Sequence, residues 1–80
     1  MEITVGTIVF SKAGRDKKKL LLTVAVEGNY AYVCDGDLRR IEKPKKKKLI
    51  HLQKTNQTVL LENELTNSKV RKILADYNQG

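Results

Sequence analysis

The sequence predicts a mainly β domain: a small, partly closed β barrel flanked by one amphipathic α-helix at the C-terminal end. Short β-branched and apolar runs alternate with glycine-containing turns before the apolar residues change to the spacing of one helix face. A chain of 80 residues has room for one core. We therefore expect a single domain over 1–80, with the barrel over about 3–52 and the helix over about 67–77.

The first strand and the loop after it follow from composition. Residues 3–10 are rich in isoleucine, valine and threonine, with Gly6 as a bend or bulge, and they predict a strand. Residues 11–19 contain a glycine and mostly cations, with one acid, which is typical of a solvated loop. We name this stretch the first basic loop; its cations are Lys12, Arg15, Lys17, Lys18 and Lys19.

Residues 20–34 are predicted to form a β-hairpin. The apolar run 20–26 is interrupted only by a threonine and is too short for a helix to be preferred. Glu27-Gly28-Asn29 then turns the chain into a partner strand over 30–34. Alternation places Tyr30 and Tyr32 of that strand on one face.

A turn and a second cationic stretch follow the hairpin. Asp35-Gly36 predicts a type I′ turn into a short strand over 37–41, because that turn needs positive φ at both central positions. After that strand the chain continues as a loop that contains its only proline. We name residues 39–48 the second basic segment. Its cations are Arg39, Arg40, Lys43, Lys45, Lys46, Lys47 and Lys48.

The remaining sequence contains one strand and the helix. Residues 49–52 resume a strand, 53–57 are a polar connector, and the short apolar piece 58–61 is left unassigned. Thr66 or Asn67 is a good N-cap for a helix whose apolar positions recur at i, i+3, i+4 and i+7. These positions are Val70, Ile73, Leu74 and Tyr77.

The charge pattern indicates a polyanionic partner. Sixteen Lys and Arg oppose nine Asp and Glu, which gives a formal charge of +7. Clustering favours nucleic-acid contact over simple solubility, because the second basic segment has seven cations against Glu42 alone. Arg15, Arg39 and Arg40 carry extra weight, since a guanidinium forks onto a phosphate or stacks on a base.

Other kinds of site have weaker support. Cys34 and His51 lack an evident orienting partner for nucleophilic catalysis, and they are two ligands where zinc needs about four. Tyr30 and Tyr32 are candidates for base stacking, but we favour half-buried packing in the barrel. We expect no enzyme activity, no cofactor, no metal and no small-molecule substrate.

The expected setting is the cytoplasm. A single cysteine suits a reducing compartment, and no apolar run approaches the length of a membrane span. The N-terminus lacks a basic start followed by an apolar core, so neither secretion nor a membrane partner is predicted. We expect a monomer.

Two stretches, in this order, resemble a known family. They are Gly6-Thr-Ile-Val-Phe-Ser-Lys-Ala-Gly-Arg-Asp-Lys17 and Asp35-Gly-Asp-Leu-Arg-Arg-Ile-Glu-Lys-Pro-Lys-Lys-Lys-Lys-Leu-Ile-His-Leu52. Both are similar to the bacterial KOW-domain RNA-binding proteins, which are related to a large-subunit ribosomal protein family of archaea and eukaryotes. The resemblance covers roughly 3–52, and 65–74 also resembles the tail of the bacterial members. It implies an SH3-like β barrel of KOW type that binds ribosomal or another structured RNA without catalysis.

The resemblance also implies which residues bind RNA. The KOW loop of the family corresponds to Lys12, Ala13, Gly14, Arg15, Asp16 and Lys17 of this sequence. The second basic element of the family corresponds to Asp37, Arg39, Arg40, Lys43 and Lys45 to Lys48. The first basic loop adds Lys18 and Lys19. Lys18 departs from the family pattern, which has glycine there and so more backbone freedom.

The leading hypothesis is a non-catalytic domain that contacts the phosphate backbone of structured RNA, with ribosomal RNA or the large ribosomal subunit as partner. The alternative is an SH3-like protein-interaction module associated with the ribosome or the transcription machinery.

Overall fold

The computed structural model describes residues 2–14, 18–61 and 64–79. Its strands are β1 (Thr7–Ser11), β2 (Leu20–Glu27), β3 (Tyr30–Cys34), β4 (Lys45–Lys48) and β5 (Leu52–Thr58), with the 3₁₀ helix η1 (Leu49–His51) between the last two. The helix α1 (Asn67–Gln79) ends the described chain. The predicted mainly β domain with one C-terminal helix is therefore confirmed.

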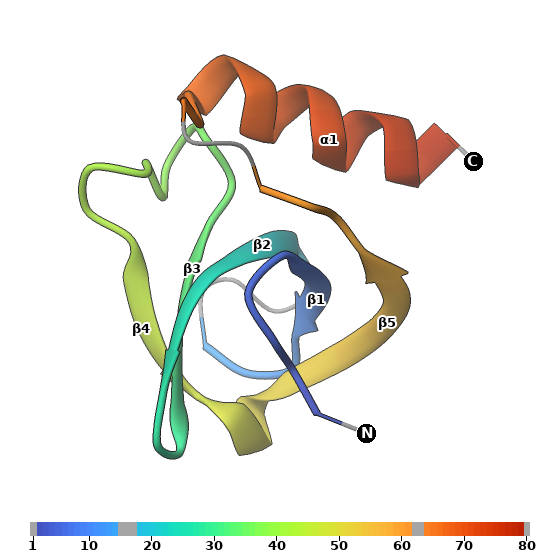
Figure 1. Ribbon diagram of the computed structural model, residues 1–80. Helices are drawn as coiled ribbons and strands as arrows, with labels where there is room; N and C mark the ends of the chain where they lie inside the picture. Colours follow the sequence, from blue (N-terminus) through green and yellow to red (C-terminus); the bar gives the residue numbers. More distant parts are fainter. Residues whose placement is uncertain (1, 15–17, 62–63, 80) are drawn as a thin grey trace.

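The strands form one strongly curled antiparallel sheet. Its order is β4-β3-β2-β1-β5, and α1 lies across the outside of the curl (Figure 1). Within the described residues, the edge strands β4 and β5 are joined through η1 but do not pair with each other, so the sheet is not closed into a barrel.

Two apolar clusters hold the sheet and the helix. Because successive strand residues point to opposite faces, one set of side chains fills the inside of the curl and the other faces α1. The inner cluster consists of Val9, Leu21, Ala31, Val33 and Leu52. The outer cluster joins Ile8, Leu22 and Cys34 of the sheet to Val70 and Leu74 of the helix.

The predicted hairpin and helix are both confirmed. Glu27 pairs with Tyr30, and Gly28 between them has a φ of +59°, the sign that a type II′ turn requires at its first central position. Thr66 caps the helix, since its Oγ1 accepts a hydrogen bond of 3.1 Å from the backbone N–H of Lys69. Within the described residues, no helix is both long enough and apolar enough to cross a bilayer.

The first strand is shorter than predicted. Residues 3–6 lie outside β1, because the chain makes a tight turn there in which the Thr7 N–H donates to the Thr4 carbonyl at 3.0 Å. Gly6 is a central residue of this turn and has a φ of +95°, a conformation incompatible with a strand. The bend expected at Gly6 is present, but it ends the strand region instead of interrupting it.

The predicted strand over 37–41 is wrong. The Asp35 carboxylate accepts hydrogen bonds from the backbone N–H groups of Asp37 and Arg39, at 2.9 and 2.8 Å, and so closes a compact loop. Side-chain bonds of this kind compete with strand pairing for the backbone donors. Of the two central positions of the expected type I′ turn, Gly36 alone has positive φ.

The chain after residue 42 also differs from the prediction. Residues 45–48, expected in a loop, form β4 on the edge of β3, where long lysine side chains are well tolerated. Residues 49–51 form η1 in place of a strand, and the expected connector 53–57 lies within β5. The polar strand β5 is secured on one side, where Thr55 Oγ1 donates to the Ile8 carbonyl at 2.6 Å.

Candidate nucleic-acid interface

The first basic loop is closed at its base by backbone hydrogen bonds. Ser11 donates to the Lys19 carbonyl at 3.1 Å and Lys18 donates to the Ser11 carbonyl at 2.7 Å, while Lys12 is tied to η1 by donating to the His51 carbonyl at 2.8 Å. Lys12, Gly14 and Lys18 are exposed. Lys19 is partly buried. The remaining predicted site residues of this loop, Arg15 and Lys17, lie outside the described residues, as does Asp16.

Lys18 adopts the conformation that glycine would favour. Its φ is +70°, in the left-handed region, and it is the one non-glycine residue with positive φ in the described part of the chain. The turn therefore closes without the glycine of the family pattern, at the cost of backbone strain at a lysine.

We expect Lys18→Gly to raise the free energy of unfolding by roughly 0.5–1 kcal/mol. A residue with a side chain is strained in the left-handed conformation, and removing the side chain relieves about 1–2 kcal/mol of this strain. Glycine has more freedom in the unfolded chain, which takes back about 0.4–1 kcal/mol of the gain. Lys19→Gly is the matched control, because it removes the same charge without relieving strain and should destabilise by about 0.5–1 kcal/mol. Urea unfolding followed by circular dichroism measures both; effects of the same sign would contradict the expectation.

The four lysines of β4 are divided between two faces. Cross-strand partners share a face of the sheet. Lys45 and Lys47 pair with Val33 and Ala31, whose side chains belong to the inner cluster. Lys46 and Lys48 pair with Tyr32 and Tyr30. We name the first pair the loop-side lysines and the second the tyrosine-side lysines.

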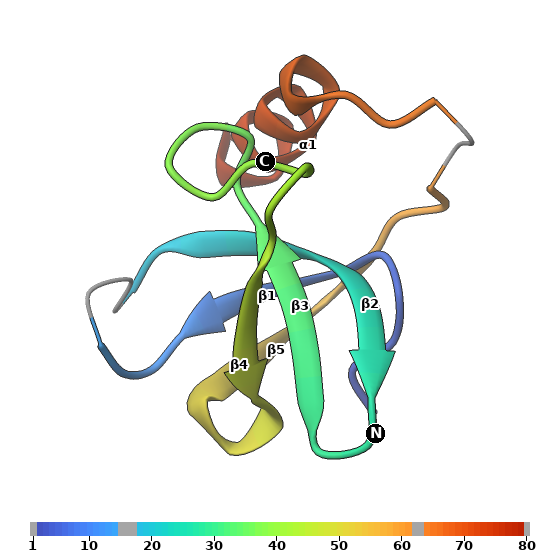
Figure 2. The same ribbon diagram turned by 90° about the vertical axis from the view of Figure 1, so that its left-hand side faces the viewer.

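The two basic regions of the sequence meet at Gly14. The Lys47 Nζ lies 3.8 Å from the position that a Cβ would occupy on Gly14, so this ammonium group is beside the backbone of the first basic loop. Strand pairing supports the same arrangement. Phe10 pairs with Leu20 and Leu22 with Cys34, so β1 and β3 both end beside the first residues of β2, which lies between them (Figure 2).

The cations of the 35–44 loop are held beside the start of α1. The Asn67 side chain accepts from the Ile41 N–H and donates to both oxygens of Glu42, each at 2.8 Å. Arg71 donates to the Gly36 carbonyl. Of the predicted site residues in this loop, Arg40 and Lys43 are exposed and Arg39 is partly buried. Asn67 therefore fixes this loop against α1, a role that its sequence position as an N-cap candidate did not indicate.

Glu42 reduces the positive charge of this loop. Hydrogen bonds from the Asn67 amide, and then from its own backbone, lower the pKa of the Glu42 carboxyl, and the charge of Arg40 lowers it further. Arg40 Nε lies 3.7 Å from Glu42 Oε1, with both side chains more than half exposed. An ion pair this exposed contributes little stability, so the guanidinium can exchange it for a phosphate.

The two tyrosines of β3 lie on the outer face of the sheet. Both are partly buried, as expected, but they point away from Ala31 and Val33, which belong to the inner cluster. Lys46 Nζ lies 4.5 Å from the centroid of the Tyr30 ring, a cation–π contact. These tyrosines were not among the predicted site residues. Had 45–48 been assigned as a strand, its alternation would have placed lysines opposite the tyrosines and so indicated them.

Cys34 belongs to the core. It is fully buried in the outer cluster under α1. Burial, and to a lesser extent the negative charges of Asp35 and Glu42, raises the pKa of the Cys34 thiol to about 11. The group is a neutral thiol at pH 7, with a packing role.

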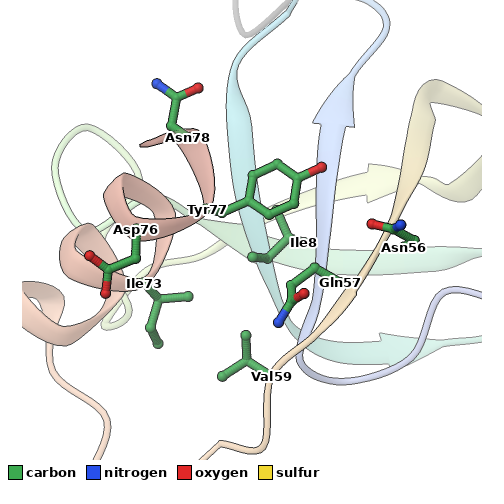
Figure 3. Close-up of a pocket in the computed structure, with 8 residues that line it drawn as sticks. All are labelled: Ile8, Asn56, Gln57, Val59, Ile73, Asp76, Tyr77 and Asn78. Atoms are coloured by element: carbon green, nitrogen blue, oxygen red, sulfur yellow. The ribbon is translucent and has the colours of Figure 1, made fainter. Parts of the chain in front are cut away.

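A groove of about 700 Å³ lies between β5 and α1, away from the described cations of the basic loops. The ring of Tyr77 extends from the helix over Ile8, and Gln57 and Val59 lie below it (Figure 3). The lining combines apolar, amide and carboxylate groups, so the groove does not share the cationic character of the candidate interface.

No protein-family model matches the chain, and no curated protein is significantly similar to it.

Proposed function

We propose that the chain is a non-catalytic RNA-binding domain that contacts the phosphate backbone of structured RNA. The observation that carries this proposal is the position of Lys47 Nζ beside Gly14, which joins the two basic regions at one place on the surface. A run of phosphates is bound by several cations at once, so cations from separate stretches of sequence must converge. The loop-side lysines together with Lys12 and Lys18 supply such a set.

Backbone groups offer contacts to phosphate in addition to those of the charged side chains. Gly14 is exposed, has a φ of +77° and bears no side chain, so a phosphate oxygen has close access to the backbone there. Contacts of this kind position an RNA without reading its sequence. The domain is therefore suited to recognising the shape of a folded RNA.

The proposal includes a finer fold and a partner. The curled sheet is proposed to be an SH3-like barrel of KOW type, supported by the order of its strands around a common interior and by the sequence resemblance over 3–52. The proposed partner is ribosomal RNA or the large ribosomal subunit in the cytoplasm, bound by a monomer.

We expect RNA affinity to fall steeply with salt. With roughly six phosphate contacts, a plot of log affinity against log salt concentration for a duplex fragment of ribosomal RNA should have a slope of about −5. Lys47→Gln should lower affinity about tenfold, whereas Lys72→Gln, which removes the same charge from an exposed position on α1, should leave it nearly unchanged. Fluorescence anisotropy with labelled RNA measures both. A slope near zero, or equal losses in the two variants, would contradict the proposal.

The alternative, a protein-interaction module, is distinguished by nuclease treatment. Partners that the tagged protein retains through RNA disappear from a pull-down after RNA digestion, whereas a directly bound protein remains. Retention of the large-subunit proteins after complete digestion would favour the alternative.

A further inference from the structure

The outer face of β3 and β4 combines aromatic rings with cations. Tyr30 and Tyr32 lie two residues apart on β3, both partly exposed, and the tyrosine-side lysines Lys46 and Lys48 are directly opposite them on β4. Lys46 and Lys48 are exposed. We name these four side chains the tyrosine face. It is separate from the loop-side surface, because strand alternation directs the two sets of side chains to opposite faces of the sheet.

We propose that the tyrosine face binds unpaired bases of an RNA single strand, an inference that rests on the proposed function. Bases stack on aromatic rings whatever their identity, and adjacent lysines hold the backbone that connects them. The spacing of two residues along β3 places successive rings roughly 6–7 Å apart along the strand, within the span of neighbouring nucleotides in an extended strand.

The charges across this face determine on which strand the phosphates lie and on which strand the bases lie. Glu27 of β2 pairs with Tyr30 on the side opposite the lysines, and Ala25 pairs with Tyr32. An acid on one side of the tyrosines and lysines on the other favour phosphates along β4 and bases over β3. The small Ala25 side chain leaves the Tyr32 ring open on the β2 side.

The contact between Lys46 and Tyr30 does not prevent stacking. An exposed cation–π contact is worth roughly two- to fivefold in equilibrium terms, whereas stacking a base on an aromatic ring is worth roughly 10- to 100-fold. A base therefore displaces the ammonium group from the Tyr30 ring, and the flexible lysine then reaches the adjoining phosphate. In the free protein the same contact keeps the cation next to the stacking ring.

The test compares three RNA probes by fluorescence anisotropy: a labelled oligouridine, an abasic oligonucleotide of the same length, and an RNA duplex. The wild-type protein should bind the oligouridine more tightly than the abasic strand by roughly 100-fold or more, at about tenfold or more for each of the two rings, because only the oligouridine can stack. Replacing both Tyr30→Leu and Tyr32→Leu should remove that preference and leave duplex affinity unchanged. Tyr30→Phe with Tyr32→Phe, which keeps both rings, should retain the preference.

A second measurement uses the unaltered protein, so that it does not depend on the folding of the leucine variant. Stacking moves the ring-proton resonances of Tyr30 and Tyr32 upfield on addition of oligouridine, with Tyr77 in the β5–α1 groove as the internal control. Equal binding of the oligouridine and abasic strands, or ring shifts at Tyr77 equal to those at Tyr30 and Tyr32, would overturn the inference while leaving duplex binding, and with it the proposed function, intact. Failure to bind the duplex as well would overturn the proposed function itself.

Discussion

Gly6→Ala is expected to unfold most of the protein at physiological temperature. A Cβ at this position would overlap the carbonyl oxygen of Val59, a backbone atom that cannot move aside as a side chain does. The φ of +95° adds strain of about 1–3 kcal/mol for any residue with a side chain. A backbone shift that relieved the overlap would also break two hydrogen bonds of 2.8 Å. In one the Gly6 N–H donates to the Thr23 carbonyl, and in the other the Val59 N–H donates to the Gly6 carbonyl.

The total cost is about 3–5 kcal/mol, summed from the strain and about 1 kcal/mol for each hydrogen bond, and it is comparable with the whole stability of a small domain. Gly28→Ala is the matched control. Its φ is also positive, at +59°, but a Cβ there has nothing within 4 Å, so a loss of about 1–2 kcal/mol is expected. Urea unfolding of the two variants separates steric overlap from backbone strain, and equal losses would show that the overlap at Val59 is unimportant.

Gly6 illustrates a limit of sequence reasoning. A glycine within a β-branched run indicates a bend or bulge, and the bend is present. The segment that crosses it, Val59, is more than fifty residues away in the chain, so its approach depends on the tertiary fold. Local pattern therefore predicted the conformation but not the contact that makes the glycine necessary.

The elements that the sequence predicted well are those with an apolar pattern of their own. The hairpin of β2 and β3 and the helix α1 each bury a continuous set of side chains, and burial dominates their local preferences. β4 and most of β5 are polar. They are strands because an unpaired edge of β3 or β1 offers backbone hydrogen bonds, a cause that lies outside their own sequence.

The candidate site shows the same division. The presence of two cationic regions was evident from composition, and their closeness near Gly14 is supported by the structure. From the sequence, however, 45–48 were expected in a loop, and a loop has no alternation that would separate the four lysines by face. Once these residues form a strand, alternation separates them into the loop-side and tyrosine-side pairs and brings the second pair to Tyr30 and Tyr32.

This separation predicts that two double variants of identical composition will differ in the RNA they fail to bind. Lys45→Gln with Lys47→Gln should reduce affinity for duplex RNA by about 100-fold, at about tenfold per lysine, and make the salt slope less negative by about 2. Lys46→Gln with Lys48→Gln should leave duplex affinity nearly unchanged and reduce affinity for an oligouridine strand by a similar factor.

Each double variant is the control for the other, because both remove two positive charges from the same strand and change the long-range field of the protein equally. The corresponding arginine pairs keep the charges and should preserve binding. Loss of fold is excluded as the cause if each glutamine pair still binds the other RNA. If both glutamine pairs weakened both RNAs equally, the four lysines would act through net charge alone, and their alternation on β4 would have no part in recognition.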